Sequence, residues 1–350
     1  MKKVLFATTA LIATAGMAAA EVKISGYGRF GLDWNEANDT RPGVSETNIT
    51  SRFRLTFDVS TETDGGVTVG GRIRAQAENR DGGENIDPTS ASFGEANTQA
   101  TFSSPQFHVA YGGLRVNVGN IWGAIDSAPG LYLNTTSVGT GIDGMGFNSL
   151  AIKGAGFDTF TSAGDGRGGI EAIYSAGGFT GHLSYSQQNG DLTTGTPGSA
   201  DGEERTAIML NYSFGDYFVT GAYQSSDNGP LITKGGVAVN ANDDIMFFAA
   251  GADFGQFGAT LQYAETERAD SVTLAGEAEI GAASTLIGWV NSADIDDTVL
   301  AADQTVNDGT SFGINYEYDL GGGVTFVAGY VQTAADTNEN SVQAGLHFSF

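Results

Sequence analysis

The sequence predicts an all-β protein, a sixteen-stranded antiparallel transmembrane β-barrel with an inward-folded third loop. Three observations predict it: long segments alternate between apolar and polar side chains, tight turns alternate with longer connections, and aromatic side chains gather beside the tight turns. Strict period-two alternation places apolar and polar side chains on opposite faces of a strand. Short turns on one side, longer loops on the other and an even strand number are typical of membrane barrels.

The first twenty residues have the features of a secretory signal peptide. Lys2 and Lys3 give a positively charged start, residues 4–13 are apolar, and Ala18–Ala20 form a small-residue cleavage site. We therefore expect export and a mature chain, residues 21–350, that forms one barrel domain. Loss of the two lysines takes the formal charge from −25 to −27.

The composition excludes several classes of protein. A strongly acidic chain is unsuited to nucleic acid, whose phosphates select a basic surface. The absence of cysteine excludes disulfides and thiolate metal sites. After residue 20 no stretch of about 18 apolar residues occurs, so a helical membrane span is excluded. The 21 Phe, 12 Tyr and 3 Trp are too many for a disordered chain.

The strands are predicted one by one from the alternation and the turns. The clearest segments are residues 22–34, 49–60, 67–78, 311–320 and 341–350. Seven tight turns are expected at residues 61–66, 112–113, 177–178, 215–216, 255–256, 281–282 and 321–323. Eight longer connections are expected at residues 35–47, 79–104, 122–168, 187–204, 226–243, 268–271, 293–309 and 334–340. Fifteen connections imply sixteen strands.

A water-soluble β-sandwich is the alternative explanation of the alternation. Strands of about 9–11 residues favour a tilted membrane crossing, because strands of globular proteins average about 5–6. Aromatic residues at the tight turns suit a girdle at the membrane interface; they include Phe214, Tyr217, Phe254, Phe257 and Tyr318. In lipid only a closed barrel leaves no strand edge unpaired.

Inward-facing arginines are the first candidate functional residues. A barrel of sixteen strands is wide enough for a water-filled lumen, and with apolar side chains toward lipid five arginines of the first three strands face it. They are Arg29, Arg52, Arg54, Arg72 and Arg74. One interpretation is that they only solvate the wall. The other is that they form the basic side of a constriction, where a narrow pore focuses their field on passing solutes.

The connection over residues 122–168 is the second candidate functional element. It is too long for a simple surface loop and contains apolar stretches, residues 131–133 and 145–152, that require burial. We expect it to fold inward, narrow the lumen and place Asp126 and Asp143 opposite the arginines.

Several motifs together resemble a known family. The chain is similar, over its whole mature length, to the general porins of alphaproteobacteria, in particular those of the Rhodobacter group. The motifs are Glu21–Gly26, Arg52–Asp58, Gly70–Gln76, Gly119–Gly123, Tyr318–Gly323 and the terminal Phe350. The resemblance implies an outer-membrane homotrimer in contact with lipid, an eyelet between the arginines and the third loop, and recognition of Phe350 during assembly.

The expected function is passive diffusion of small hydrophilic solutes and ions, with weak cation preference and without catalysis. The alternatives are a barrel that only anchors an enzyme or adhesin, for which neither a catalytic constellation nor large outer insertions are evident, and a substrate-specific channel. No cofactor is expected. Acidic loops such as residues 81–87 and 294–297 offer oxygen ligands for calcium, as in some family members, but lack EF-hand spacing, and solvated loops are the simpler interpretation.

Overall fold

The structure, a computed structural model, describes residues 20–40, 45–80, 101–135, 150–188, 202–304, 308–334 and 340–350. The predicted signal peptide lies outside these ranges apart from its last residue, and it stays a prediction.

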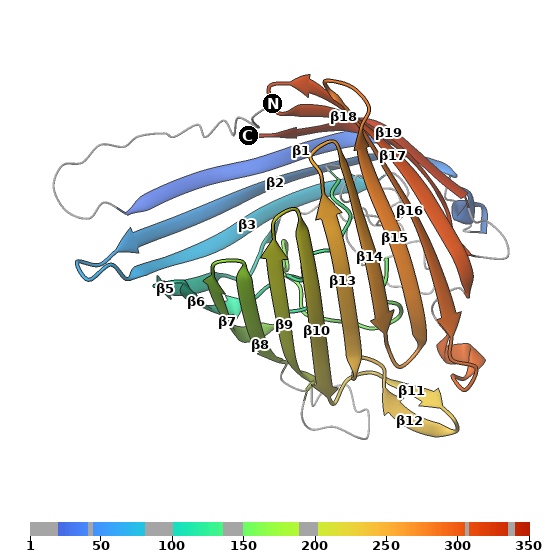
Figure 1. Ribbon diagram of the computed structural model, residues 1–350, viewed down its shortest axis with the longest axis horizontal. Helices are drawn as coiled ribbons and strands as arrows, with labels where there is room; N and C mark the ends of the chain where they lie inside the picture. Colours follow the sequence, from blue (N-terminus) through green and yellow to red (C-terminus); the bar gives the residue numbers. More distant parts are fainter. Residues whose placement is uncertain are drawn as a thin grey trace.

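The chain forms one closed antiparallel sheet, as predicted (Figure 1). Its first half contains β1 (Glu21–Asn35), β2 (Thr47–Glu62), β3 (Thr68–Arg80), β4 (Thr101–Phe102), β5 (Gln106–Tyr111), β6 (Leu114–Asn120), β7 (Gly168–Ala176), β8 (Phe179–Gln187) and β9 (Glu204–Phe214). Its second half contains β10 (Tyr217–Asp227), β13 (Ile245–Asp253), β14 (Phe257–Glu265), β15 (Ala269–Glu279), β16 (Ser284–Ile295), β17 (Gly309–Gly321), β18 (Val324–Gln332) and β19 (Asn340–Ser349). Each strand pairs with the next, except that β3 pairs with both β4 and β5, and β19 pairs with β1.

The sheet has sixteen strand positions because β4 and β5 share the fourth one. Both pair with β3, β4 at Ala75 and Gln76 and β5 along residues 68–72. Outside the barrel, β11 (Leu231–Lys234) and β12 (Val237–Asn240) form a separate hairpin. Two 3-10 turns, η1 (Glu36–Thr40) and η2 (Ala301–Asp303), complete the described elements. None of the described helices is long and apolar enough to cross a membrane.

All seven predicted tight turns join neighbouring strands in the structure. One predicted longer connection, residues 268–271, is wrong: β15 begins at Ala269 and β14 ends at Glu265, so a tight turn of residues 266–268 joins the two strands. The side chain and backbone of Thr266 bond to Ala269 and tighten this turn.

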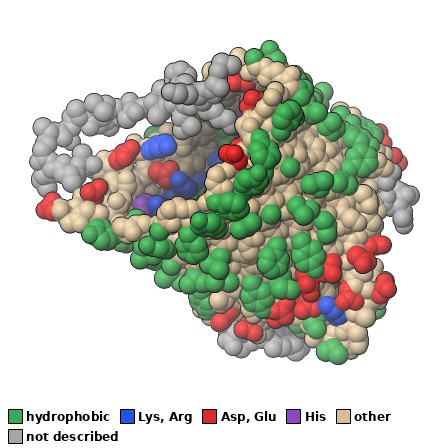
Figure 2. All heavy atoms as spheres, viewed as in Figure 1, with side chains coloured by type: hydrophobic (Ala, Val, Ile, Leu, Met, Phe, Trp, Pro, Cys, Tyr) green, Lys and Arg blue, Asp and Glu red, His purple; other side chains and the backbone are tan. Residues whose placement is uncertain are grey.

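The faces of the strands are inverted relative to a soluble protein. Asn291, Gln262 and Asn315 point into the barrel and are about 1% exposed, whereas Val290, Leu261 and Ile314 beside them are 41–53% exposed. Figure 2 shows hydrophobic side chains spread over the outer wall and Lys and Arg side chains inside the hollow. A continuous apolar outer surface needs a non-aqueous environment, which contradicts the sandwich alternative and suits a lipid-facing barrel.

The aromatic residues at the tight turns are exposed, as the girdle requires. The rings of Phe214 and Tyr217 lie 5.7 Å apart, and that of Phe254 lies 5.9 Å from Tyr217. These rings form a contiguous band at one rim of the barrel, where amphipathic side chains suit the boundary between lipid and water.

Aromatic side chains of the same chain pack over Gly26 and Gly28 of the first strand. An added Cβ atom at Gly28 would lie 2.3 Å from the ring of Phe348, and one at Gly26 would lie 2.9 Å from the ring of Phe350. Aromatic rings of the neighbouring strand cover both glycines, and the space is filled within the chain itself.

Candidate pore and its third loop

The predicted arginines lie on one wall of the lumen. Arg29 and Arg52 are direct partners in the pairing of β1 with β2. Arg54 donates a hydrogen bond to Gln76 (2.7 Å), and its guanidinium lies 5.0 Å from the centre of the Tyr27 ring. These side chains face inward, as the alternation predicted.

Arg72 is partly neutralised on the same wall. Its Nε atom lies 2.7 Å from Oδ1 of Asp58, and both side chains are 30% exposed. The pair is open to water in the lumen, which screens the attraction between its charges. Arg72 therefore presents a weaker field to a passing ion than an unpaired arginine would.

Arg74 differs from the other arginines because aromatic rings enclose it. Its guanidinium lies 4.8 Å from the ring centre of Trp122 and 4.6 Å from that of Phe160, and it donates to Ser162 (3.0 Å). Guanidinium planes bind aromatic faces by cation–π attraction, which strengthens where water is excluded. Arg74 thus joins the arginine wall to the third loop, residues 121–167.

The two ends of the third loop run side by side where they leave the wall. We call residues 120–124 and 158–162 the neck. Asn120 both donates to and accepts from the backbone of Thr161 (2.8 and 3.0 Å). Gly123 has φ +84°, and a Cβ atom there would lie 2.7 Å from Cβ of Asp158. Only glycine combines this backbone conformation with this close approach.

Beyond the neck the loop folds inward and packs on the far wall, as predicted. One apolar cluster joins Ile125, Leu131 and Ile152 of the loop to Met209 and Phe247 of β9 and β13. A second joins Leu133 and Leu150 to residues of β15, β16 and β18. In Figure 1 the described part of the loop runs inside the barrel, behind the strands nearest the viewer. Burial of these apolar groups is the main force that holds the loop against the wall.

Polar side chains of the wall satisfy the carbonyl groups that the loop buries. Side chains of β10, β14, β15 and the turn between the last two donate to loop carbonyls: Gln262 to Gly130 (2.5 Å), Ser271 to Ala151 (2.5 Å), Thr266 to Lys153 (2.9 Å) and Gln224 to Gly156 (3.0 Å). Buried carbonyl groups need such donors, since a loop has no ladder of its own. These bonds determine the course of the loop along the wall.

A buried carboxylate binds the first turn of the loop. Glu171 of β7 accepts hydrogen bonds from the backbone of Gly123 (2.9 Å) and from Asn117 (2.7 Å), and Nε2 of His182 lies 3.0 Å away. The side chains of Glu171 and His182 are at most 1% exposed. Alternation predicts that both face inward, but nothing local in the sequence pairs them.

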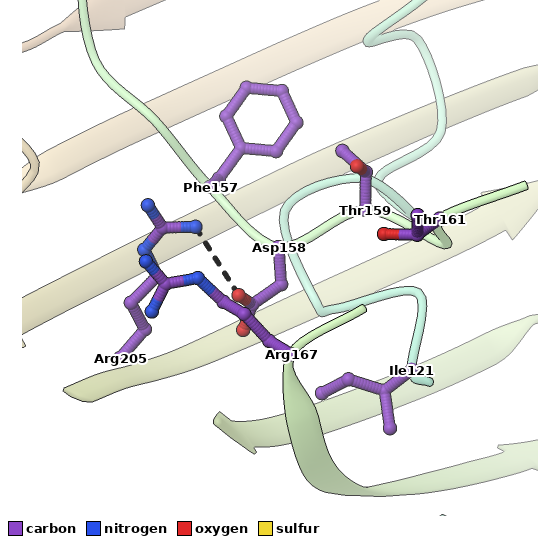
Figure 3. Close-up of a pocket in the computed structure, with 7 residues that line it drawn as sticks. All are labelled: Ile121, Phe157, Asp158, Thr159, Thr161, Arg167 and Arg205. Atoms are coloured by element: carbon purple, nitrogen blue, oxygen red, sulfur yellow. Dashed lines mark hydrogen bonds and ion pairs between the residues drawn. The ribbon is translucent and has the colours of Figure 1, made fainter. Parts of the chain in front are cut away.

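An ionic cluster binds the returning limb of the loop, and sequence reasoning missed it. Arg205 lies 3.3 Å from Asp158 and 3.1 Å from Glu203, and Arg167 also pairs with Glu203. Arg205, Arg167 and Asp158 line a cavity of about 120 Å³, and Figure 3 shows their side chains around it. Burial alone would raise the pKa of Glu203, but hydrogen bonds from Asn242 and the adjacent guanidinium groups lower it overall.

Of the two predicted loop carboxylates, the structure describes only Asp126. Asp126 accepts a hydrogen bond from the Tyr132 hydroxyl (2.5 Å) within the loop itself. Burial raises the pKa of Asp126 to about 6, although this hydrogen bond favours the charged form. Asp143 lies outside the described residues. That both oppose the arginines stays a prediction.

No group of acidic or histidine side chains within the described ranges is arranged to hold a metal ion. Residues 81–87, one of the acidic segments considered for calcium, lie outside those ranges. The other, residues 294–297, contains Asp296, whose carboxylate binds Thr298 and Lys234. Hydrogen bonds from Thr298 and Lys234 lower the pKa of Asp296 to about 2.

Comparison with known proteins identifies the family. The family model of the Gram-negative porins matches residues 7–340. The chain belongs to the Gram-negative porin family. The porin of Fuscovulum blasticum is 30% identical over 334 residues, which cover 94% of this porin and 100% of that protein. The porin of Rhodobacter capsulatus is 26% identical over 352 residues, with the same coverage.

Solved structures agree with the fold of this porin. An engineered variant of Rh. blastica porin superimposes with a TM-score of 0.69 at 26% identity and covers 94% of this chain and 100% of that one. A second variant gives 0.68 at 27% identity with the same coverage. The predicted resemblance to Rhodobacter-group porins is confirmed, and the protein is an outer-membrane channel for small solutes.

Proposed function

We propose that this porin is a general diffusion pore with weak cation selectivity, which passes small hydrophilic solutes and ions without catalysis. The observation that carries the proposal is the position of the third loop. It packs on the wall of β9, β10 and β13–β16, whereas the arginines lie on β1–β3, and we infer that solutes pass between the two.

The charges support a weak rather than a strong preference. The formal charge of the chain is −25, and Figure 2 shows acidic side chains gathered at the end that carries β11 and β12. The negative potential of these acidic side chains raises the local concentration of cations at the entrance of the pore. The arginine wall opposes this field inside the lumen, and Asp58 offsets one of its charges.

We further propose that the pore is a homotrimer in the outer membrane and that it needs no cofactor. The trimer rests on what is typical of the family. Calcium in the outer acidic loops likewise stays a proposal.

Planar-bilayer recording of the purified protein tests the function. With a salt gradient across the bilayer, we expect stepwise conductance and a reversal potential displaced modestly toward that of the cation. An absence of conductance in correctly folded protein would contradict the pore, and a reversal potential on the anion side would contradict the selectivity.

A further inference from the structure

We propose that Glu171 is a positioning residue of the pore, which holds the neck of the third loop and, through the indole of Trp122, the guanidinium of Arg74. The inference rests on the proposed function as a pore, because it concerns how a lumen charge is held in place. Glu171 itself does not contact a passing solute.

The first step is the environment of the carboxylate. Oε1 accepts from Nδ2 of Asn117 (2.7 Å) and lies 3.4 Å from the backbone nitrogen of Trp122; Oε2 accepts from the backbone of Gly123 (2.9 Å) and lies 3.0 Å from Nε2 of His182. Both oxygens of a fully buried group are therefore engaged by fixed donors. A buried carboxylate without such donors would be strongly disfavoured.

The second step concerns the parts of the protein that supply these hydrogen-bond donors. Asn117 and His182 are side chains of the wall strands β6 and β8, whereas Trp122 and Gly123 are backbone groups of the loop. Glu171 is therefore the link between rigid wall and loop at the residue where the loop begins. On the neighbouring strand, Ser184 accepts from the backbone of Ala124 (3.0 Å) and extends the link by one residue.

The third step connects the backbone of the loop at Trp122 with the guanidinium group of Arg74. The side chain of Trp122 leaves this anchored turn and covers Arg74 at 4.8 Å, while Phe160 of the returning limb covers it at 4.6 Å. The Trp122 and Phe160 rings lie 5.0 Å apart. If this turn moves, the indole of Trp122 moves with it, and the guanidinium of Arg74 loses one of its two aromatic contacts.

The experiment uses Glu171→Gln in a Trp34→Phe/Trp289→Phe background, where Trp122 is the single tryptophan of the chain. An amide has one acceptor oxygen and a donor group in place of the second oxygen, so it opposes one of the existing donors. We expect a red shift of Trp122 emission, several-fold greater quenching by acrylamide, and several-fold greater open-channel current noise.

Glu277→Gln is the matched control, because Glu277 accepts from Asn134 of the same loop at 2.8 Å but in an exposed position away from the neck. It should leave the emission and the noise unchanged. Heat-modifiable migration on a denaturing gel verifies that each variant folds. Unchanged Trp122 emission and noise in folded Glu171→Gln would overturn the proposal.

Two further variants separate positioning from a merely structural role. Combining Glu171→Gln with Trp122→Ala should add little to the noise of Trp122→Ala alone, because both act on the same contact; additive effects would overturn the route through Trp122. If Glu171→Gln fails to fold, His182→Phe removes one donor and keeps the carboxylate, and it should shift Trp122 emission in the same direction. No shift would overturn the proposal.

The emission measurement is independent of conductance. A wild-type protein without conductance would contradict the pore function, whereas the Trp122 emission of the variants tests Glu171 in either case.

Discussion

The main chains of Gly26 and Phe350 exchange two hydrogen bonds, with N–O distances of 2.9 and 3.0 Å, and so join the last residue of the chain to the first strand. The Phe350 ring fills the space above Gly26 and stacks on Phe53 of β2, with 5.6 Å between ring centres. The terminal residue thus contacts two strands beyond its own and completes the closure of the barrel.

Deletion of Phe350 should lower the amount of folded, membrane-inserted protein sharply and leave the conductance of surviving channels unchanged. The deletion removes two backbone bonds at the closing edge, and unpaired backbone groups in lipid cost several kcal/mol each. Membrane fractions at matched expression measure the amount. Phe350→Tyr, which retains the ring and the backbone, is the control, and equal levels of deletion and wild type would refute the prediction.

The double variant Arg52→Ala/Arg72→Ala should raise the single-channel conductance and move the reversal potential further toward cations. It removes two positive charges from the lumen, and it also leaves Asp58 without its partner. Lys234→Gln in the outer hairpin, where Lys234 pairs with Glu267, removes one positive charge outside the barrel and should change both quantities little. Wild-type values in the double variant would show that these arginines only line the wall.

Cation preference should fall as the pH falls through about 6, because the Asp126 carboxylate, whose pKa burial raises to about 6, becomes neutral below that value. Reversal potentials between about pH 4.5 and 7 measure the change; Lys153, whose pKa burial lowers to about 8, remains charged there. Histidines titrate in the same range, so the comparison is with Asp126→Asn.

Asp126→Asn should lack the Asp126 part of the pH response. Tyr132→Phe should move the midpoint upward, because the lost hydrogen bond favours the charged form. An identical pH response in wild type and Asp126→Asn would contradict this assignment.

Replacement of Arg205 by methionine should destabilise the protein more than other lumen substitutions. Asp158 and Glu203 would remain buried with one positive partner fewer, and breaking a buried ion pair costs roughly 3–5 kcal/mol. The midpoint of unfolding in denaturant, followed by gel migration, measures the loss. Glu277→Ala, at an exposed lumen position, serves as the control, and equal midpoints of the two variants would be inconsistent with the prediction.

The protein should migrate as a heat-sensitive trimer. Unheated and boiled samples on a denaturing gel give the comparison, with light scattering in mild detergent as a second measure of mass. A single species of monomer mass in both measurements would exclude the trimer.

The sequence by itself determined the strands, their faces and their number. Period-two alternation is a local property, readable along any ten residues, and the tight turns are equally local. The inward orientation of Arg29 beside outward Phe30 therefore needed no knowledge of distant residues. Strand ends were less certain, because the alternation continues into the turn at Thr266.

Only the tertiary structure decided the course of the third loop and the surroundings of each charge. Gln262 bonds to Gly130, 132 residues earlier in the chain, and Glu171 bonds to Gly123, 48 residues earlier. Such contacts depend on the closed barrel, which brings distant wall positions next to the loop. The alternation placed Arg74 correctly on the lumen face, but its enclosure by Trp122 and Phe160 arises because the two limbs of the loop meet where β3 passes them.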